Sequence, residues 1–196
     1  MTHRRPSLVA AACVASLLVL IAGCDKDKKG VEPPAELVDL KPTLAVQKVW
    51  DTGVGGGGEK LRLALGLALD RGVLFTAARD GEVIALDPTS GRVKWSQDTK
   101  TDLAAGPGVG ASVVAVGTSD GKVVALDVAS GKVLWKMSVS SEVLAAPLVT
   151  GDRVIVRSVD GRVHALDALT GKSQWTGEEP VPKLSLRGTA SPVLAK

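Results

Sequence analysis

The sequence contains few of the residues from which most metal, disulfide and base-stacking sites are built. Its 196 residues include two histidines, two cysteines, one phenylalanine and no tyrosine. His3 lies in a segment that we interpret below as a signal peptide, so His164 has no second histidine with which to bind a metal ion. Few aromatics and no stripe of basic residues leave no surface typical of nucleic-acid binding. We therefore predict no metal, no cofactor and no nucleic-acid partner.

Charge and catalytic groups are equally uninformative about a substrate. The chain has 24 basic and 21 acidic residues, and loss of Arg4 and Arg5 with the signal would leave a near balance. The glycine-rich stretch 53–60 lacks the Gly-Lys-Ser/Thr of a phosphate-binding loop, so we interpret it as a flexible loop. No serine has a visible base with an orienting partner. We predict no catalytic residue and no enzymatic activity.

The N-terminus has the charged and then apolar order of a secretory signal. Arg4 and Arg5 precede the uninterrupted apolar run 8–23, which is short for a membrane span. The run ends in Leu-Ile-Ala-Gly before Cys24, which resembles the bacterial lipobox, where the cysteine receives a diacylglycerol. We predict that 1–23 is a lipoprotein signal peptide and that Cys24 is the lipidated N-terminus. An ordinary secretory signal or membrane anchor with an incidental cysteine is the alternative.

The residues that follow read as a tether. Residues 24–44 are rich in charge and proline, as expected of a solvated linker. With Cys24 as the one remaining cysteine, no intramolecular disulfide forms, so stability has to come from packing. Asp25 resembles the signal that retains enterobacterial lipoproteins in the inner membrane, so sorting to the inner or the outer membrane stays open.

A sixteen-residue phrase recurs at 40-residue intervals. It begins at Asp80, Asp120 and Asp160 and reads DGEVIALDPTSGRVKW, DGKVVALDVASGKVLW and DGRVHALDALTGKSQW. A fixed period of about 40 residues with strand-like runs and turn residues is the signature of β-propeller blades. We predict an all-β fold in which residues 45–196 form a partial propeller of four-stranded blades.

The middle repeat shows how one blade is expected to be built. Strand-like runs cover 112–118, 122–127, 132–138 and 143–149, which we assign as its four strands. The Asp-Gly pairs at 81, 121 and 161 favour hairpin turns with positive φ. Three aspartates precede Ser-Gly or Thr-Gly turns and are predicted to bind turn amides and hydroxyls: Asp87, Asp127 and Asp167.

The repeats end at Trp95, Trp135 and Trp175. Their recurrence predicts packing between blades, against small residues of a neighbouring blade that include Ala85, Ala125 and Ala165. His164 takes the place of Ile84 and Val124 in the other repeats, so we interpret it as a half-buried strand residue. Residues 45–50 read as an isolated outer strand ending in Trp50.

The repeat resembles the PQQ-type propeller repeat, in which Ala-Leu-Asp precedes a turn with Ser or Thr before Gly, and Trp follows. That superfamily includes quinone-dependent dehydrogenases as well as members that bind proteins, and the repeat alone does not choose between them. After Trp175 the chain departs from the repeat in a segment containing Leu184-Ser185-Leu186-Arg187-Gly188. Together with the lipobox and tether, this string resembles the BamB family of lipoproteins of the outer-membrane β-barrel assembly machinery.

The resemblance implies a non-enzymatic, lipid-anchored protein on the periplasmic face of the outer membrane. It assigns Leu184, Leu186 and Arg187 to the surface that binds a POTRA domain of BamA, and unfolded outer-membrane proteins are further partners that it implies. Leucines flanking an arginine suit an interface hot spot. The alternative for this string is a buried strand start with a capped turn.

The chain also differs from the family. BamB-like propellers have eight blades, whereas this sequence holds three complete repeats before Lys196, so we expect a fragment or truncated product with unpaired edges. Client specificity and oligomeric state do not follow from the sequence. Two alternative functions stay open: a periplasmic propeller that binds another protein, and a remnant of a PQQ-dependent dehydrogenase.

Overall fold

The computed structural model describes residues 34–39, 41, 43–56, 58, 63, 65–178 and 190–195. The chain divides into two units, Met1–Val46 and Gln47–Lys196, and the strands of the described residues lie in the second. Within the described ranges, no helix is long and apolar enough to cross a membrane. The predicted signal peptide, Cys24 and the segment 184–187 lie outside the described residues.

In the described part of the chain, twelve strands form three four-stranded antiparallel sheets, each ordered as in the chain. Blade 1 consists of β1 (Ala68–Asp70), β2 (Val73–Ala77), β3 (Glu82–Leu86) and β4 (Val93–Asp98). Blade 2 consists of β5 (Gly108–Gly110), β6 (Val113–Gly117), β7 (Lys122–Asp127) and β8 (Val133–Ser138). Blade 3 consists of β9 (Leu148–Val149), β10 (Arg153–Arg157), β11 (Arg162–Asp167) and β12 (Ser173–Glu178).

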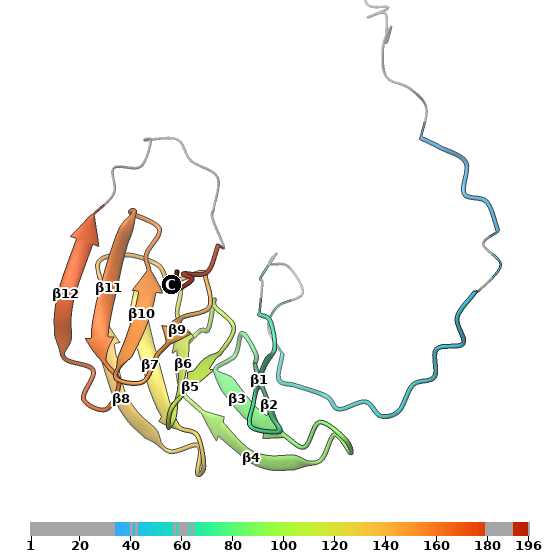
Figure 1. Ribbon diagram of the computed structural model, residues 1–196, viewed down its shortest axis with the longest axis horizontal. Helices are drawn as coiled ribbons and strands as arrows, with labels where there is room; N and C mark the ends of the chain where they lie inside the picture. The colour runs from blue at the N-terminus through green and yellow to red at the C-terminus, as the bar shows by residue number, and fades with distance from the viewer. Residues whose placement is uncertain are drawn as a thin grey trace, which may run out of the picture. The chain divides into compact units, whose positions relative to one another are not determined.

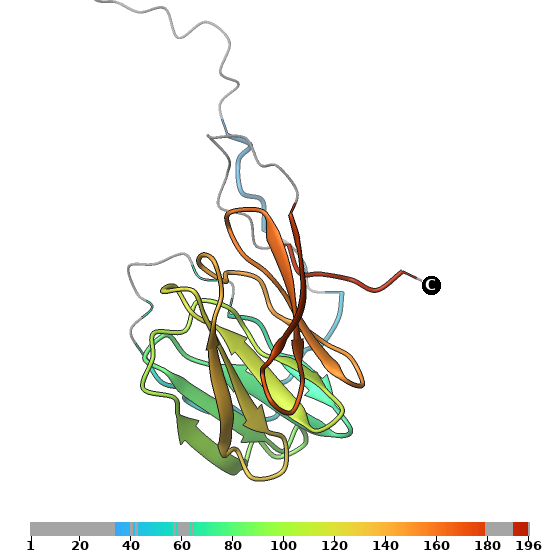
Figure 2. The same cartoon turned by 90° about the vertical axis from the view of Figure 1, so that its left-hand side faces the viewer.

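The three sheets lie beside one another as propeller blades. The short inner strands β1, β5 and β9 contact each other in order and gather near the centre of Figure 1, whereas the outer strands β4, β8 and β12 lie at the periphery. The turned view in Figure 2 shows the sheets facing one another rather than joining edge to edge. The all-β fold of four-stranded blades is therefore confirmed, with three complete blades in the described part.

The predicted strand order of the middle blade is wrong in one respect. Its fourth strand is β5, which precedes the repeat phrase, and not the stretch 143–149. Only Leu148 and Val149 of that stretch are in a strand, and they pair with β10 of blade 3. Val143 instead lies in the connector and packs against Gly117 of blade 2, where a Cβ would come 2.7 Å from the Val143 Cβ.

Two hydrophobic clusters hold the blades together. Between blades 1 and 2, Phe75 and Val83 pack with Val114, Val124 and other buried residues. Between blades 2 and 3, Val113 and Val123 pack with Val154, Val156 and Leu166 in the same way. Alternation along β6 and β7 therefore sends even-numbered residues towards blade 1 and odd-numbered residues towards blade 3, so these central strands are apolar on both faces.

Two of the repeat tryptophans contact the blade that follows their own. Trp95 Nε1 donates to the carbonyl of Val128 (2.9 Å), and its ring covers Gly131, where a Cβ would lie 2.5 Å from Cε3. Trp135 repeats the arrangement at Ala168 (2.9 Å) and Gly171. The turn glycines have φ near 70°, which adds a second reason for glycine there.

These contacts confirm inter-blade packing for Trp95 and Trp135 but correct the predicted partners. Ala85, Ala125 and Ala165 lie opposite the tryptophans within the same sheet, so they are not on the neighbouring blade. Trp175 contacts no following blade in the described part of the chain, and it is 45% exposed against 9% for Trp135.

Trp50 contacts blade 1 in the way that Trp95 contacts blade 2. Its Nε1 donates to the Pro88 carbonyl (2.9 Å), its ring covers Gly91, and Thr52 Oγ1 donates to the Gly91 carbonyl (2.8 Å). Residues 45–50 are not a strand, contrary to prediction, because no neighbouring strand pairs with them among the described residues. The docking of the tryptophan therefore does not require a sheet around it.

The predicted aspartate turns are confirmed. Asp127 Oδ1 accepts hydrogen bonds from Ser130 N (2.8 Å) and Ser130 Oγ (2.6 Å), and Asp87 and Asp167 accept the matching bonds in their own blades. The hydroxyl and amide of Ser130 lower the pKa of Asp127 because they stabilise its charged form. These carboxylates act as turn caps rather than as catalytic groups.

Candidate interaction surface

One rim of the blades carries the turns between the second and third strands together with the connectors from each outer strand to the next inner strand. We call it the connector rim; it comprises the turns 78–81, 118–121 and 158–161 and the connectors 99–107 and 139–147. Antiparallel order places these segments at the same end of every sheet. Because Arg162 pairs with Glu178 in the β11–β12 register, β12 also ends at this rim.

Hydrogen bonds to their aspartates hold the Asp-Gly turns of the rim in place. Gly81, Gly121 and Gly161 have φ values of 103°, 75° and 89°, as predicted from the Asp-Gly pairs. In blade 3, the buried Ser158 Oγ donates to Asp160 (2.5 Å), and Thr118 does the same for Asp120. Blade 1 has alanine at the equivalent position 78, and its Asp80 instead accepts a bond from the Gly56 amide (2.7 Å).

Arg79 joins blades 1 and 2 at the rim. Its Nη2 forms an ion pair with Asp102 of the connector (3.0 Å), and its Nη1 donates to Ser119 Oγ of blade 2 (3.0 Å) and to the Leu103 carbonyl (3.3 Å). The side chain is 17% exposed. Sequence reasoning missed this residue because it lies at a position that varies between repeats, where Ser119 and Val159 are its counterparts.

A polar hollow of about 370 Å³ opens between the first two blades on this rim. Its lining includes the carboxylates of Asp80, Asp102 and Asp120 and the ammonium groups of Lys100 and Lys122. Lys122 pairs with Asp120, and Lys100 pairs with Asp98 (2.6 Å). The hollow is therefore nearly neutral and suits hydrogen bonding to a polar partner surface better than capture of a single ion. The described residues contain no group of three potential metal ligands.

At blade 3 the rim ends in a chain of ion pairs. Arg162 lies between Asp160 (Nη1 to Oδ2, 3.1 Å) and Glu178 (Nη2 to Oε2, 3.4 Å). Glu178 is the last residue of β12, and the chain continues from it towards the predicted binding residues Leu184, Leu186 and Arg187. Those three residues lie outside the described ranges, so their role stays a prediction.

His164 lies behind this rim in a cluster of hydroxyl groups. Its Nε2 is 3.0 Å from Ser140 Oγ and 3.3 Å from Ser158 Oγ, and its Nδ1 is 3.2 Å from Thr176 Oγ1. The residue is 8% exposed, more buried than predicted. Neither ring nitrogen bonds a carboxylate within the described part of the chain, so the group does not form the Ser-His-Asp relay of a hydrolase.

Acid should weaken blade 3 through His164. Burial lowers the pKa of His164 below its ordinary value of 6.5 because the charged ring is poorly solvated there. The unfolded chain therefore binds more protons below this value, and stability falls as the pH drops from 6.5 towards the lower folded pKa. The variant His164→Val copies Val124 of blade 2. Between about pH 7.5 and about pH 5.5, its melting temperature should fall by less than that of the parent. Calorimetric melting curves at both pH values check this, and identical losses would contradict it.

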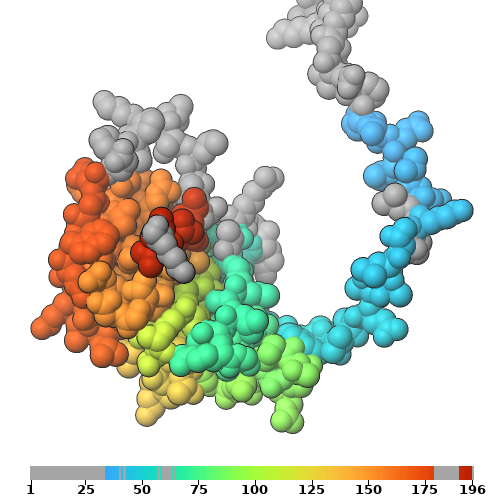
Figure 3. Space-filling view, viewed as in Figure 1, coloured from blue at the N-terminus to red at the C-terminus, as the bar shows by residue number. Residues whose placement is uncertain are grey.

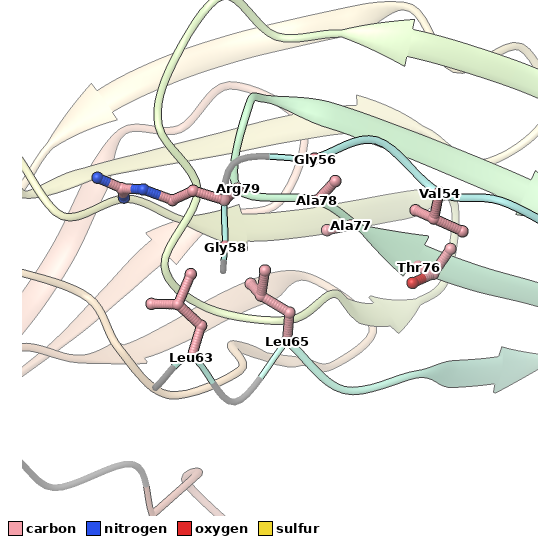
Figure 4. A pocket seen from close by; sticks show the side chains of 9 residues that line it. All are labelled: Val54, Gly56, Gly58, Leu63, Leu65, Thr76, Ala77, Ala78 and Arg79. Carbon is pink, nitrogen blue, oxygen red and sulfur yellow. The ribbon is translucent and has the colours of Figure 1, made fainter. Parts of the chain in front are cut away.

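The glycine-rich stretch binds carboxylates instead of offering a phosphate loop. Gly55 N donates to Glu82 Oε2 (2.9 Å) and Gly56 N to Asp80 Oδ2 (2.7 Å). Beside it lies a hollow of about 290 Å³, in which Leu63 and Leu65 face the end of β2, while the Arg79 guanidinium points away (Figure 4). Residues 51–56 have neither helix nor strand, in line with the predicted loop.

Comparison with known proteins decides the family. The profile of the family described as outer membrane protein assembly factor BamB matches residues 46–104 and 79–196, which together take in all three blades. The chain belongs to the BamB family. Since that match covers most of the chain, the family assignment rests on the blades themselves rather than on the Leu-Ser-Leu-Arg string alone.

Curated BamB proteins are similar to part of the chain. The outer membrane protein assembly factor BamB of Pseudomonas aeruginosa is 40% identical over 87 residues, which are 44% of this chain and 23% of that protein. The BamB of Xanthomonas campestris is 41% identical over 81 residues, which are 41% of this chain and 20% of that protein. The matched part of the chain thus spans less than a quarter of these two BamB relatives.

Solved structures agree with the fold. The crystal structure of BamB from Moraxella catarrhalis has a TM-score of 0.63 at 30% sequence identity, covering 69% of this chain and 41% of that one. A europium-containing methanol dehydrogenase has a TM-score of 0.50 at 28% identity, covering 57% of this chain and 24% of that one. The blades of the BamB family therefore share their architecture with an enzyme, so function has to be argued from the surface.

Proposed function

We propose that the chain is a non-enzymatic subunit of the β-barrel assembly machinery, anchored through Cys24 to the periplasmic face of the outer membrane. In this role it binds the POTRA region of BamA through Leu184, Leu186 and Arg187 and assists the insertion of β-barrel proteins. The observation that carries the proposal is membership of the BamB family, whose curated relatives are named as assembly factors.

The described surface supports a binding role. Arg79 and the Asp-Gly turns fix the connector rim. Strand β12 ends at this rim with Glu178, and the predicted binding segment follows it in the sequence. A rigid base of this kind reduces the entropy lost when a loop engages a partner. His164, the one histidine among the described residues, contacts three hydroxyl groups and has no carboxylate partner there, which favours a structural role over catalysis.

Photo-crosslinking from position 186 in native envelopes tests the proposal. The parent is expected to capture BamA, and Arg187→Glu should lose most of that capture because the reversed charge removes the forked donor. The matched control is Lys172→Glu, an exposed basic residue in the β11–β12 turn at the opposite rim. Capture of a different protein would assign the propeller to another complex, and bound quinone absorbance would favour the dehydrogenase alternative.

A further inference from the structure

The end of β12 is the point at which the chain leaves blade 3 for the predicted binding segment. Strand β12 ends at Glu178, and Leu184, Leu186 and Arg187 follow in the sequence. The arrowhead of β12 in Figure 1 marks this end, and Figure 3 shows blade 3 in orange with β12 on its outer side. The direction in which the segment starts therefore depends on how firmly the last residues of β12 are held against β11.

Arg162 joins the end of β12 to the Asp-Gly turn of its own blade. It lies directly opposite Glu178 in the β11–β12 register. Its Nη1 is 3.1 Å from Asp160 Oδ2, and its Nη2 and Nε are both 3.4 Å from Glu178 Oε2. A guanidinium carries five N–H donors in a rigid fork, so one side chain can serve both carboxylates at once.

Asp160 is itself held by a buried residue. Ser158 is 1% exposed, and its Oγ donates to Asp160 Oδ1 (2.5 Å). The Ser158 amide donates to the Arg162 carbonyl (2.9 Å), and the Arg162 amide donates to Asp160 Oδ1 (3.3 Å). The contacts therefore run from the interior of blade 3, through the turn, to Glu178 at the end of β12.

The other two blades lack this link at the same place. In blade 2 the positions of Arg162 and Glu178 hold Lys122 and Ser138, and serine offers no charge to the ammonium group. In blade 1 the same positions hold two carboxylates, Glu82 and Asp98. Among the three described blades, the ion pair at the end of the outer strand is thus confined to the blade from which the predicted binding segment leaves.

We propose, resting on the function proposed above, that Arg162 is a positioning residue for the binding of BamA. By holding Glu178, it fixes the direction in which the binding segment leaves β12. The pair is partly exposed, at 40% for Arg162 and 64% for Glu178, so it contributes little to the stability of the blade. Its effect lies at the strand end, because strand ends open most easily and a segment whose start is held loses less freedom on binding.

Binding of the purified full chain to a soluble POTRA array of BamA from the same organism tests this role. Arg162→Gln should weaken the Kd by about threefold to fivefold, whereas the melting temperature should fall by no more than about 2 °C. The matched control is Arg153→Gln, which makes the same change on the same blade. Arg153 is 46% exposed and contacts Gln174 near the start of β12, so its variant should bind like the parent.

A double-mutant cycle separates positioning from direct contact with the partner. Glu178→Gln should weaken the Kd as much as Arg162→Gln does, and the double variant no more than either single one, because each change breaks the same pair. Hydrogen exchange of the amides 175–178 should become faster in all three variants. Additive losses of affinity would show that Arg162 contacts BamA itself and would overturn the positioning role.

The outcomes also separate this role from the proposed function. If the parent binds, Arg187→Glu weakens binding and Arg162→Gln matches Arg153→Gln, the positioning role is wrong while the proposed function stands. If the folded parent does not bind the POTRA array, both proposals fail. If Arg162→Gln unfolds part of the protein and the folded molecules bind like the parent, Arg162 only stabilises blade 3 and the positioning role is wrong. Melting curves of all variants measure the folded fraction.

Discussion

Replacing Trp135 by alanine is expected to lower the free energy of unfolding by about 3–5 kcal/mol, the range observed when a large buried aromatic is removed. Trp135 is 9% exposed, belongs to the cluster between blades 2 and 3, and donates its Nε1 hydrogen bond to the Ala168 carbonyl. Truncation would open a cavity over Gly171 and leave that carbonyl without its indole donor. Urea unfolding followed by circular dichroism measures the change.

Trp175→Ala supplies the internal comparison for that experiment. It removes the same side chain from the same repeat position, but the ring is 45% exposed and donates no hydrogen bond to a described residue. We expect a loss below about 1 kcal/mol, the usual scale for an exposed position. Equal losses for the two variants would show that stability comes from the tryptophan within its own sheet and would contradict the docking role.

Adding one methyl group at Gly108 is expected to be the second most damaging change. A Cβ there would overlap the carbonyl oxygen of Pro147 and lie 2.7 Å from its carbonyl carbon, where the inner strands of blades 2 and 3 meet. Backbone cannot move aside as a side chain does, so Gly108→Ala should cost at least the roughly 1–3 kcal/mol typical of overpacking. Denaturant midpoints of the parent and the variant measure this cost.

Gly151→Ala is the matched control, because a Cβ at that position has no atom within 4 Å. Its effect should stay within about 0.5 kcal/mol. Should Gly108→Ala prove as harmless as Gly151→Ala, blades 2 and 3 would have to be able to separate near their inner strands without loss of stability. The close backbone approach would then not be a requirement of the fold.

The repeat predicted those parts of the fold that depend on shared residues. Asp-Gly predicted the turn at Gly121, Asp127 before Ser130-Gly131 predicted a capped turn, and the recurring tryptophan predicted contact between blades. Each of these features is encoded locally and three times over, so agreement between copies strengthens the inference.

Other features escaped prediction for physical reasons. The inner strands β5 and β9 have three and two residues, and Gly108 and Pro147 obscure any alternation there. The apolar stretch 143–149 predicts a strand, but the Val143 side chain packs in the space beside Gly117 instead. A short strand and a buried connector look alike to a reading based on hydrophobic pattern.

The candidate site was predictable only where it resembled the family. Leu184, Leu186 and Arg187 came from that resemblance and stay predictions. Arg79 could not be predicted from the repeat, because it stands at a position where the repeats differ and the shared pattern carries no information. In a repeat protein the shared positions build the scaffold, so the differing positions are where a surface acquires its own partners.

The docking of each tryptophan on the following blade also bears on how such a chain changes over evolutionary time. Each contact joins the tryptophan ring of one repeat to the glycine turn of the next repeat. Every internal repeat therefore carries both a tryptophan and a glycine turn. After duplication or loss of one 40-residue unit, each internal tryptophan still meets a glycine turn on the following blade. No new contact between blades has to arise by mutation. Genes of this kind can change their number of blades in single steps, while selection acts separately on residues such as Arg79 that differ between the copies.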